Sequence, residues 1–135
     1  METKAFNNLV EEICNDHEPD GEVKEFEPKN GNEKAKFLFI LESPGPKAKK
    51  YVSQYNEDPT AKNLKKQLDQ SNFKDRDIAI WNIVPWVLRN TNGKSRKPRP
   101  DEIKGGKVYL KQLIDKMMNL NAIVLVGAEA RKAHL

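Results

Sequence analysis

The stretch Phe37-Leu38-Phe39-Ile40-Leu41-Glu42-Ser43-Pro44-Gly45-Pro46 decides the fold of this chain. Its first five residues are apolar without alternation, a pattern typical of a strand that is buried on both faces. The Pro-Gly-Pro sequence then ends the run, because proline and glycine interrupt regular structure. The sequence therefore predicts a strand over residues 37–41 that lies inside a parallel sheet.

Two further apolar runs flank this strand along the chain, at residues 78–81 and 122–126. Helical patterns separate the three runs. One begins at Asp58-Pro59, a capping residue followed by a proline at the first helical position, and a second centres on residues 103–117, where Gly105-Gly106 leaves the start uncertain. Strands that alternate with helices form right-handed crossovers that cover both faces of a sheet. We therefore expect a three-layer α/β/α fold with a central parallel sheet.

The length of 135 residues fits one domain. Within it we expect residues 1–33 to form a helix over residues 2–14 and an acidic surface connection, and residues 34–135 to form the α/β core. The chain has no apolar run long enough to span a membrane and no apolar signal segment, so we expect a cytoplasmic protein without a membrane partner. One cysteine and two histidines predict no metal site and no cofactor.

Charge is distributed unevenly along the chain. Residues 1–33 hold 3 Lys and 10 Asp or Glu, so their net charge is −7, which leaves +11 for the remainder of a chain whose total is +4. The segment from Asn90 to Pro100 is basic and has the composition of an exposed loop. A basic body suits a polyanionic partner such as nucleic acid, although a solvated surface would have the same composition.

In parallel sheets, ligands bind beyond the carboxyl ends of the strands. This rule brings three distant segments to one edge: residues 42–45, residues 82–86 and Gly127-Ala128. These segments carry the least generic sequence in the chain, and we expect the functional site among them.

The three segments also carry a family resemblance. Residues 39–46 resemble the first active-site motif of the uracil-DNA glycosylase superfamily, a strand that ends in a Gly-Glu-Ala-Pro-Gly type of turn. Residues 81–86 (Trp-Asn-Ile-Val-Pro-Trp) resemble the strand end that presents its base-reading asparagine. Residues 123–127 with Ala130 are similar to its later strand-Gly-helix segment, and residues 58–63 fall where its first crossover helix begins. The order and spacing agree over roughly residues 36 to 133.

The resemblance implies hydrolysis of the N-glycosidic bond of uracil, or of a related damaged base, in DNA, with the nucleotide flipped out of the duplex or taken from a single strand. Glu42, with Ser43 beside it, would supply an anion or orient the attacking water, and Asn82 would read the base. The alternatives are that Glu42 is a surface carboxylate and that Asn82 holds a turn. The full set of expected site residues is Glu42 and Ser43 as catalytic, Pro44, Gly45, Tyr55 and Asn82 as base-binding, and Lys47, Lys94, Arg96 and Lys97 as contacts to the DNA backbone.

An aromatic platform for the flipped base is expected between the first motif and the helix at Pro59. Tyr51 and Tyr55 are the candidates there, Tyr55 is preferred, and Trp86 is a further possibility.

The chain departs from the family pattern in three places. Leu41 stands where the family commonly has glycine, Ser43 occupies a variable position, and no fourth strand with a His-Pro-Ser type loop follows residue 126. We therefore expect the third strand to form an open edge, the protein to be monomeric unless that edge pairs, and the activity of these 135 residues to be weak or absent. A truncated or non-catalytic relative that binds nucleic acid through the same edge is the second hypothesis. A nucleotide-binding domain of another family is the third, but the first turn lacks its Gly-rich phosphate signature.

Overall fold

The computed structural model describes residues 4–17, 20–46 and 49–134. Its centre is a parallel sheet of three strands, β2 (Phe37–Leu41), β4 (Ile78–Asn82) and β5 (Ala122–Leu125), in the order β4-β2-β5. The three predicted strands are confirmed, and each is formed by the apolar run that predicted it. β2 lies in the middle of the sheet, and its three central residues are buried, as expected for a continuous apolar run.

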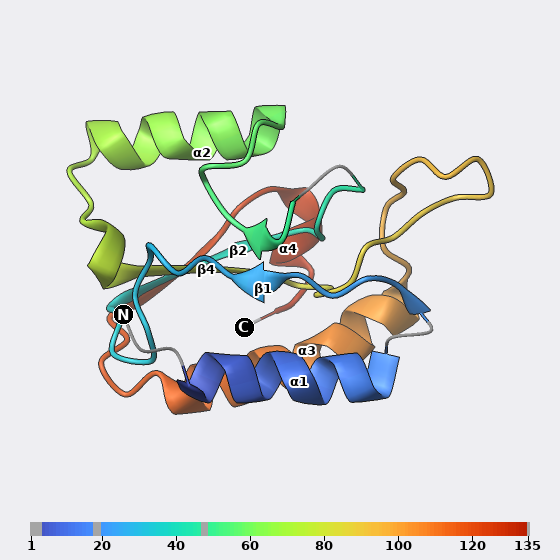
Figure 1. The fold of residues 1–135 in the computed structure, drawn as a ribbon, viewed down its shortest axis with the longest axis horizontal. Coiled ribbons are helices and arrows are strands. Elements are labelled where there is room, and N and C mark those ends of the chain that lie inside the picture. Colours follow the sequence, from blue (N-terminus) through green and yellow to red (C-terminus); the bar gives the residue numbers. More distant parts are fainter. Residues whose placement is uncertain (1–3, 18–19, 47–48, 135) are drawn as a thin grey trace.

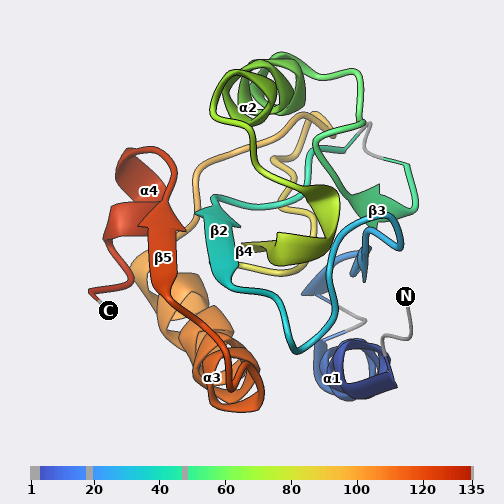
Figure 2. The same ribbon diagram turned by 90° about the vertical axis from the view of Figure 1, so that its left-hand side faces the viewer.

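Helices cover both faces of the sheet (Figure 1). On one side lies α2 (Pro59–Gln70), and on the other lie α1 (Lys4–His17) and α3 (Pro100–Lys116), which pack against each other. Figure 2 shows the same layers from the side, with the short helix α4 (Ala128–Arg131) next to β5. The predicted α/β fold is confirmed. At the start of α2 the carboxylate of Asp58 accepts a hydrogen bond from the N–H of Ala61 at 3.1 Å, the expected N-cap.

The acidic segment before β2 is not the surface connection that we expected. It contains β1 (Glu25–Phe26), which pairs in parallel with β3 (Tyr51–Val52) in a small second sheet. The ring of Phe26 is 6% exposed and stacks on the ring of Trp81 with centroids 3.8 Å apart. This segment belongs to the core because Phe26 closes one face of β4.

The segment from Glu22 to Gly31 runs antiparallel alongside the β4 region. Three contacts at successive levels fix this direction: the bridge between Val23 and Trp86, the stack of Phe26 on Trp81, and the hydrogen bond from Gly31 N–H to the Ile78 carbonyl at 2.8 Å. The start of this segment therefore lies near the carboxyl end of the main sheet, and its end lies near the amino end.

The helix α3 begins at Pro100 and continues through both glycines. Gly106 is buried, and a Cβ atom placed on it would lie 2.0 Å from the carbonyl oxygen of Ile83. The glycine thus permits the helix to approach the backbone that leaves β4, a role that its helix propensity alone did not predict.

β5 is an edge strand of the described sheet, as expected. Val124, which lies on β5, is 38% exposed. The N-terminal helix α1 packs elsewhere, against α3 and β1. Over residues 4–17, 20–46 and 49–134, no helix has the length and apolarity that a membrane crossing requires.

Candidate active site

Glu42 and Asn82 lie at the carboxyl ends of the neighbouring strands β2 and β4. The strand register pairs Leu41 with Asn82, and adjacent strands are roughly 4.8 Å apart. The pairing continues past the strand ends, because Ile83 N–H donates to the Leu41 carbonyl at 2.8 Å and Val84 N–H donates to the Glu42 carbonyl at 3.1 Å. The backbone on both sides of the two residues is therefore fixed.

Burial and three charged groups set the electrostatics of Glu42. Burial raises the pKa of its carboxyl above the ordinary value, and the nearby carboxylate of Glu129 raises it further, while Lys97 and Lys132 oppose the shift. Glu129 is buried and forms an ion pair with Lys132 at 2.9 Å. The site therefore combines a partly buried carboxylate with a second carboxylate and two cations.

Glu129 and Lys132 were not identified from the sequence. Glu129 lies on α4, which follows β5, and Lys132 is the C-cap residue of that helix. Val126 N–H donates to the Ile40 carbonyl at 2.8 Å, so α4 starts close to the end of β2. The strand-Gly-helix pattern placed Gly127 and Ala128 on the edge. Extending the same argument by one helical turn would have found Glu129 and Lys132.

Asn82 is buried, with 1% of its surface exposed, and its Nδ2 has no hydrogen-bond partner among the described residues. Asn82 is the last residue of β4, which is buried along its whole length. A buried amide nitrogen without a partner is unfavourable by roughly 1–3 kcal/mol. The indole nitrogens of Trp81 and Trp86 are also buried without a hydrogen-bond partner. An indole can only donate a hydrogen bond, whereas the carboxamide of Asn82 can both donate and accept one.

The first motif does not form the tight turn that we expected. The chain bends at Glu42 and then continues without regular structure through Ser43, Pro44 and Gly45. Gly45 is exposed, has an ordinary φ angle, and has no atom within 4 Å of the position that a Cβ would occupy. The fold of the protein therefore does not require glycine at position 45. The absence of a side chain there leaves open space beside the site.

Tyr55 does not lie at the site. Its hydroxyl donates a hydrogen bond to the carboxylate of Asp75, which precedes β4 and so marks the amino end of the sheet. That hydrogen bond, with burial adding to it, raises the pKa of Tyr55 to about 12. A strand of five residues spans roughly 16 Å, so Tyr55 and Asn82 are at opposite ends of β4.

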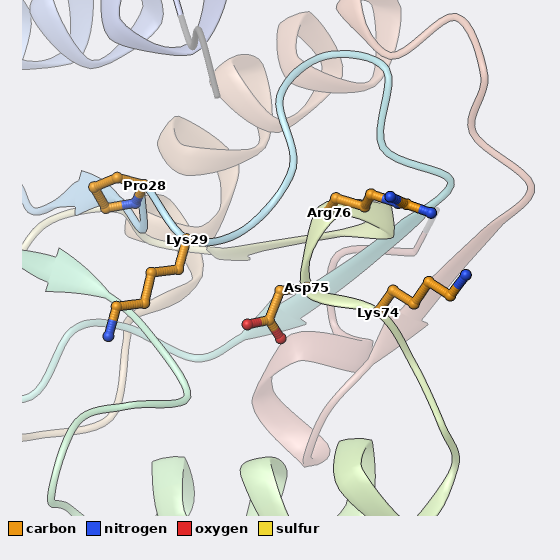
Figure 3. A pocket seen from close by; sticks show the side chains of 5 residues that line it. All are labelled: Pro28, Lys29, Lys74, Asp75 and Arg76. Atoms are coloured by element: carbon orange, nitrogen blue, oxygen red, sulfur yellow. The ribbon is translucent and has the colours of Figure 1, made fainter.

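Surface depressions also lie away from Glu42 and Asn82. One of about 560 Å³ is lined by Pro28, Lys29, Lys74, Asp75 and Arg76 at the amino end (Figure 3). Another, of about 580 Å³, includes Tyr55 and residues of α2. Neither depression contains Glu42 or Asn82.

Tyr51, the other candidate tyrosine, lies nearer to the carboxyl end of β4. Tyr51 pairs with Glu25. Glu25 lies between Val23, which bridges to Trp86, and Phe26, which stacks on Trp81. Tyr51 is therefore beside the carboxyl end of β4. Its side chain is partly exposed. Trp86, in contrast, is 3% exposed and stacks on His17 at 4.2 Å, so it covers the core.

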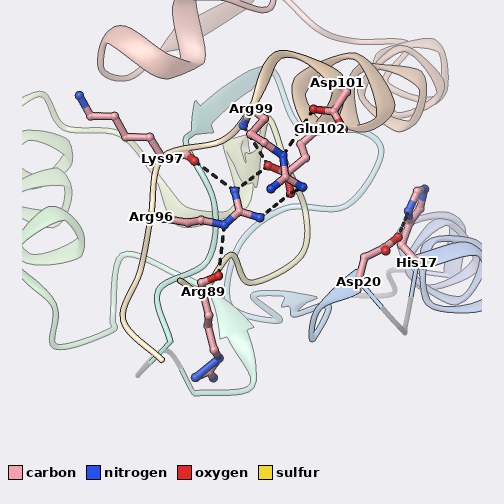
Figure 4. Close-up of polar contacts among 8 residues, drawn as sticks. All are labelled: His17, Asp20, Arg89, Arg96, Lys97, Arg99, Asp101 and Glu102. Carbon is pink, nitrogen blue, oxygen red and sulfur yellow. Dashed lines mark hydrogen bonds and ion pairs between the residues drawn. The ribbon is translucent and has the colours of Figure 1, made fainter. Parts of the chain in front are cut away.

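The basic loop is exposed as expected, but its cations differ in their contacts. Lys94 is exposed at the tip, where Gly93 has a positive φ of 77°. Arg96 is not a free phosphate contact, because its guanidinium binds both carboxylate oxygens of Glu102, at 2.7 and 2.8 Å (Figure 4). Lys97 is exposed and close enough to Glu42 to lower its pKa. Lys47 lies outside the described residues.

Within the described ranges, no three His, Cys, Asp or Glu side chains gather so that they could hold a metal ion. The family model of the uracil DNA glycosylase superfamily matches residues 28–135, which includes both strand ends of the site. Among curated proteins, no sequence matches this chain. Because the family model covers most of the chain, the chain belongs to the uracil DNA glycosylase superfamily.

Proposed function

We propose that this protein hydrolyses the N-glycosidic bond of uracil, or of a closely related base, in DNA. The observation that carries the proposal is the buried carboxamide of Asn82, whose Nδ2 lacks a partner, at the end of β4 beside the strand end that Glu42 follows. Buried polar groups are normally satisfied, so an orphaned amide at the edge where ligands bind indicates a missing hydrogen-bonding partner.

Uracil has the hydrogen-bonding groups that a carboxamide fits. The Oδ1 of Asn82 would accept from N3–H of the base, while Nδ2 would donate to O4. Cytosine presents an unprotonated N3 and an amino group at the same positions, so the same amide orientation would oppose it. A site that reads a base in this way requires the nucleotide to be flipped out of the helix.

Glu42 is suited to the hydrolytic step. As the bond between C1′ and N1 breaks, positive charge grows on the sugar, and an ionised carboxylate stabilises it. Glu42 would also orient the attacking water, whose oxygen bonds to C1′. Ser43 and Pro44 follow directly, and the open space at Gly45 lets the base or sugar approach the backbone.

The remaining contacts are proposed on position and charge. Tyr51 is the aromatic ring best placed to stack on the flipped base. Lys94 at the loop tip, and Lys47 after the first motif, would contact phosphates. The chemistry requires no redox cofactor.

We expect Asn82→Ala to lower the rate of uracil excision on the order of 10²-fold, because the variant loses the base-reading amide. The free energy of unfolding should fall by only about 1–2 kcal/mol, since no partner of Nδ2 is left unpaired. Single-turnover excision from a uracil-containing oligonucleotide and thermal unfolding measure the two effects.

Asn30→Ala is the matched control. Asn30 is also a buried asparagine, but its amide makes hydrogen bonds of 2.8 and 3.1 Å with Gln54, away from the site. It should lose more stability than Asn82→Ala and keep its excision rate at a temperature where it is folded. Excision by Asn82→Ala at the wild-type rate would remove Asn82 from the site. Uracil-DNA binding without excision by the wild type would favour a non-catalytic relative.

A further inference from the structure

The two surface depressions that lie away from Glu42 and Asn82 are rich in cations. One is at the amino end of the sheet (Figure 3), and the other lies along α2. Their linings hold six exposed or half-buried cationic side chains: Lys29, Lys62, Lys65, Lys66, Lys74 and Arg76. They hold three carboxylates: Glu57, Asp69 and Asp75. The net charge of the two linings is therefore +3, and we call the area that they form the α2 basic surface.

Tyr55 joins the two depressions into one surface. Its ring lines the depression along α2, and its hydroxyl donates to Asp75, which lines the depression at the amino end. The ammonium group of Lys29 lies 4.6 Å from the centroid of this ring, and that of Lys65 lies 5.4 Å from it. One cation from each depression is thus held against the same aromatic side chain.

Most of the cations on this surface have no carboxylate to neutralise them. Asp69 is in an ion pair with Lys65 at 2.7 Å, and Asp75 accepts the hydrogen bond from Tyr55. Within residues 4–17, 20–46 and 49–134, the other five cations lie beyond ion-pair distance of any carboxylate. Their charge is therefore available to an anion from outside the chain.

The arrangement of the cations fits a partner with a repeated negative charge. Lys62 and Lys66 are one helical turn apart, roughly 6 Å along the axis of α2. Lys74 and Arg76 continue the row past the end of the helix, toward the start of β4. A single small anion could contact only part of this row, whereas each strand of DNA carries a phosphate about every 3.4 Å along the duplex.

The opposite face of the molecule has the opposite charge. There α1, on the other side of the sheet from α2 (Figure 1), exposes three carboxylates, those of Glu11, Glu12 and Asp16. A polyanion is repelled by this face and attracted by the α2 basic surface, so the charge distribution orients the protein toward DNA with α2 in front.

The α2 basic surface is separated from the candidate active site by the length of the sheet. Asp75 lies just before β4 and Asn82 ends it, and five strand residues span roughly 16 Å. Duplex DNA is stiff, with a persistence length of about 150 base pairs. A duplex held at the carboxyl end of the sheet therefore does not bend back to the amino end within a few base pairs.

We propose that the α2 basic surface binds the phosphates of a second DNA segment, while the carboxyl end of the sheet holds the first. This inference goes beyond the proposed function and does not require the excision reaction. Because the surface contacts phosphates, its binding is independent of base sequence and weakens as the salt concentration rises. A protein with two such faces bridges two duplexes.

Lys62→Gln combined with Lys66→Gln tests this proposal. Lys104→Gln combined with Lys111→Gln is the matched control, because it removes two exposed lysines from α3 on the other side of the sheet. The first duplex is immobilised and contains 2′-fluorodeoxyuridine, whose fluorine disfavours positive charge on the sugar and so keeps the base attached. The measurement is capture of a second, fluorescent duplex without uracil.

We expect wild type and the α3 double variant to capture the second duplex equally, and the α2 double variant to capture it roughly 10-fold less. The slope of log affinity against log salt for duplex without uracil should become less steep by roughly 2 in the α2 variant. Single-turnover excision at saturating enzyme should be unchanged in both.

Three results would overturn the inference. Equal losses in the two double variants would show a general effect of charge. A parallel loss of capture and of the excision rate would place α2 on the same DNA segment as the active site. A salt-sensitive dimer that light scattering detects without DNA, and that the α2 variant abolishes, would assign the surface to the acidic face of a second copy. Salt-sensitive binding through α2 without any excision by wild type would instead overturn the proposed function alone.

Discussion

Glu42→Gln is expected to reduce uracil excision on the order of 10³-fold while leaving the protein at least as stable as wild type at neutral pH. Glutamine has nearly the same shape but cannot carry the negative charge that opposes the growing charge on the sugar. Single-turnover excision and thermal unfolding, both at pH 7, measure the two effects. Glu57→Gln, an exposed glutamate after β3, is the control and should change neither.

The stability part of this expectation follows from the pKa of Glu42. Because that pKa is raised in the folded protein, ionisation is less favourable there than in the unfolded chain. The free energy of unfolding of wild type should therefore decrease as pH rises through the pKa of Glu42 in the folded protein. Relative to wild type, the glutamine variant should be more stable above that pKa, and it should have no such advantage below the pKa of Glu42 in the unfolded chain. The excision rate of wild type should fall as the solution is acidified. The midpoint of that fall should lie at a higher pH than the pKa of about 4.3 of an unperturbed glutamate. A fully active Glu42→Gln variant would contradict the assignment.

Gly106→Ala is expected to destabilise the protein by about 3 kcal/mol, which would lower the melting temperature by roughly 10 °C. The added Cβ would lie 2.0 Å from the Ile83 carbonyl oxygen and 3.2 Å from the Val84 Cα, and backbone atoms cannot move aside as a flexible side chain can. The strand end that carries Asn82 would have to shift. Excision by the folded fraction should therefore fall as well.

Gly105→Ala, at the neighbouring position, is expected to change the free energy of unfolding in the opposite direction. Its Cβ would make an ordinary contact of 3.8 Å with the ring of Trp86. Because alanine favours a helix over glycine, this variant should gain up to about 1 kcal/mol. Thermal unfolding of the two variants together is the measurement, and a Gly106→Ala variant as stable as wild type would show that α3 and β4 do not approach as closely as described.

The local sequence pattern was sufficient to predict the three central strands and the edge of the sheet where they end. Each central strand is a continuous apolar run, and the rule that ligands bind beyond the carboxyl ends of parallel strands brought Glu42 and Asn82 together. Neither step required knowledge of distant contacts, because a buried strand has its own signature in the sequence.

Features that depend on distant partners could not be predicted in this way. β1 has two residues, Glu25 and Phe26, which is too short for any periodicity, and its acidic surroundings resemble a loop. The choice between Tyr51 and Tyr55 depends on the direction in which β3 pairs, and the preferred residue, Tyr55, lies against Asp75 at the amino end of β4. The two tyrosines are four residues apart and have the same chemistry, so composition gave no basis for the choice.

Side-chain partners were similarly hidden. Arg96 lies in a run of basic residues that suggested phosphate contacts, and Glu102 is six residues away at the first turn of a helix. Counting charge in the loop treated Arg96 and Lys97 alike. Only the folded geometry separates the cation that holds the loop from the one that extends from it.

The position of β2 in the middle of the sheet also constrains the order in which the protein assembles. Phe37 is paired with Ile78 on one side and with Ala122 on the other, so two long stretches of chain must close before the central strand has both neighbours. Contacts between residues so far apart in sequence slow folding. A partly folded chain would already carry its lysines and arginines, yet it would lack the pairing that brings the ends of β2 and β4 to one edge. Under the proposed function, attraction to DNA would therefore develop earlier than the capacity to act on it.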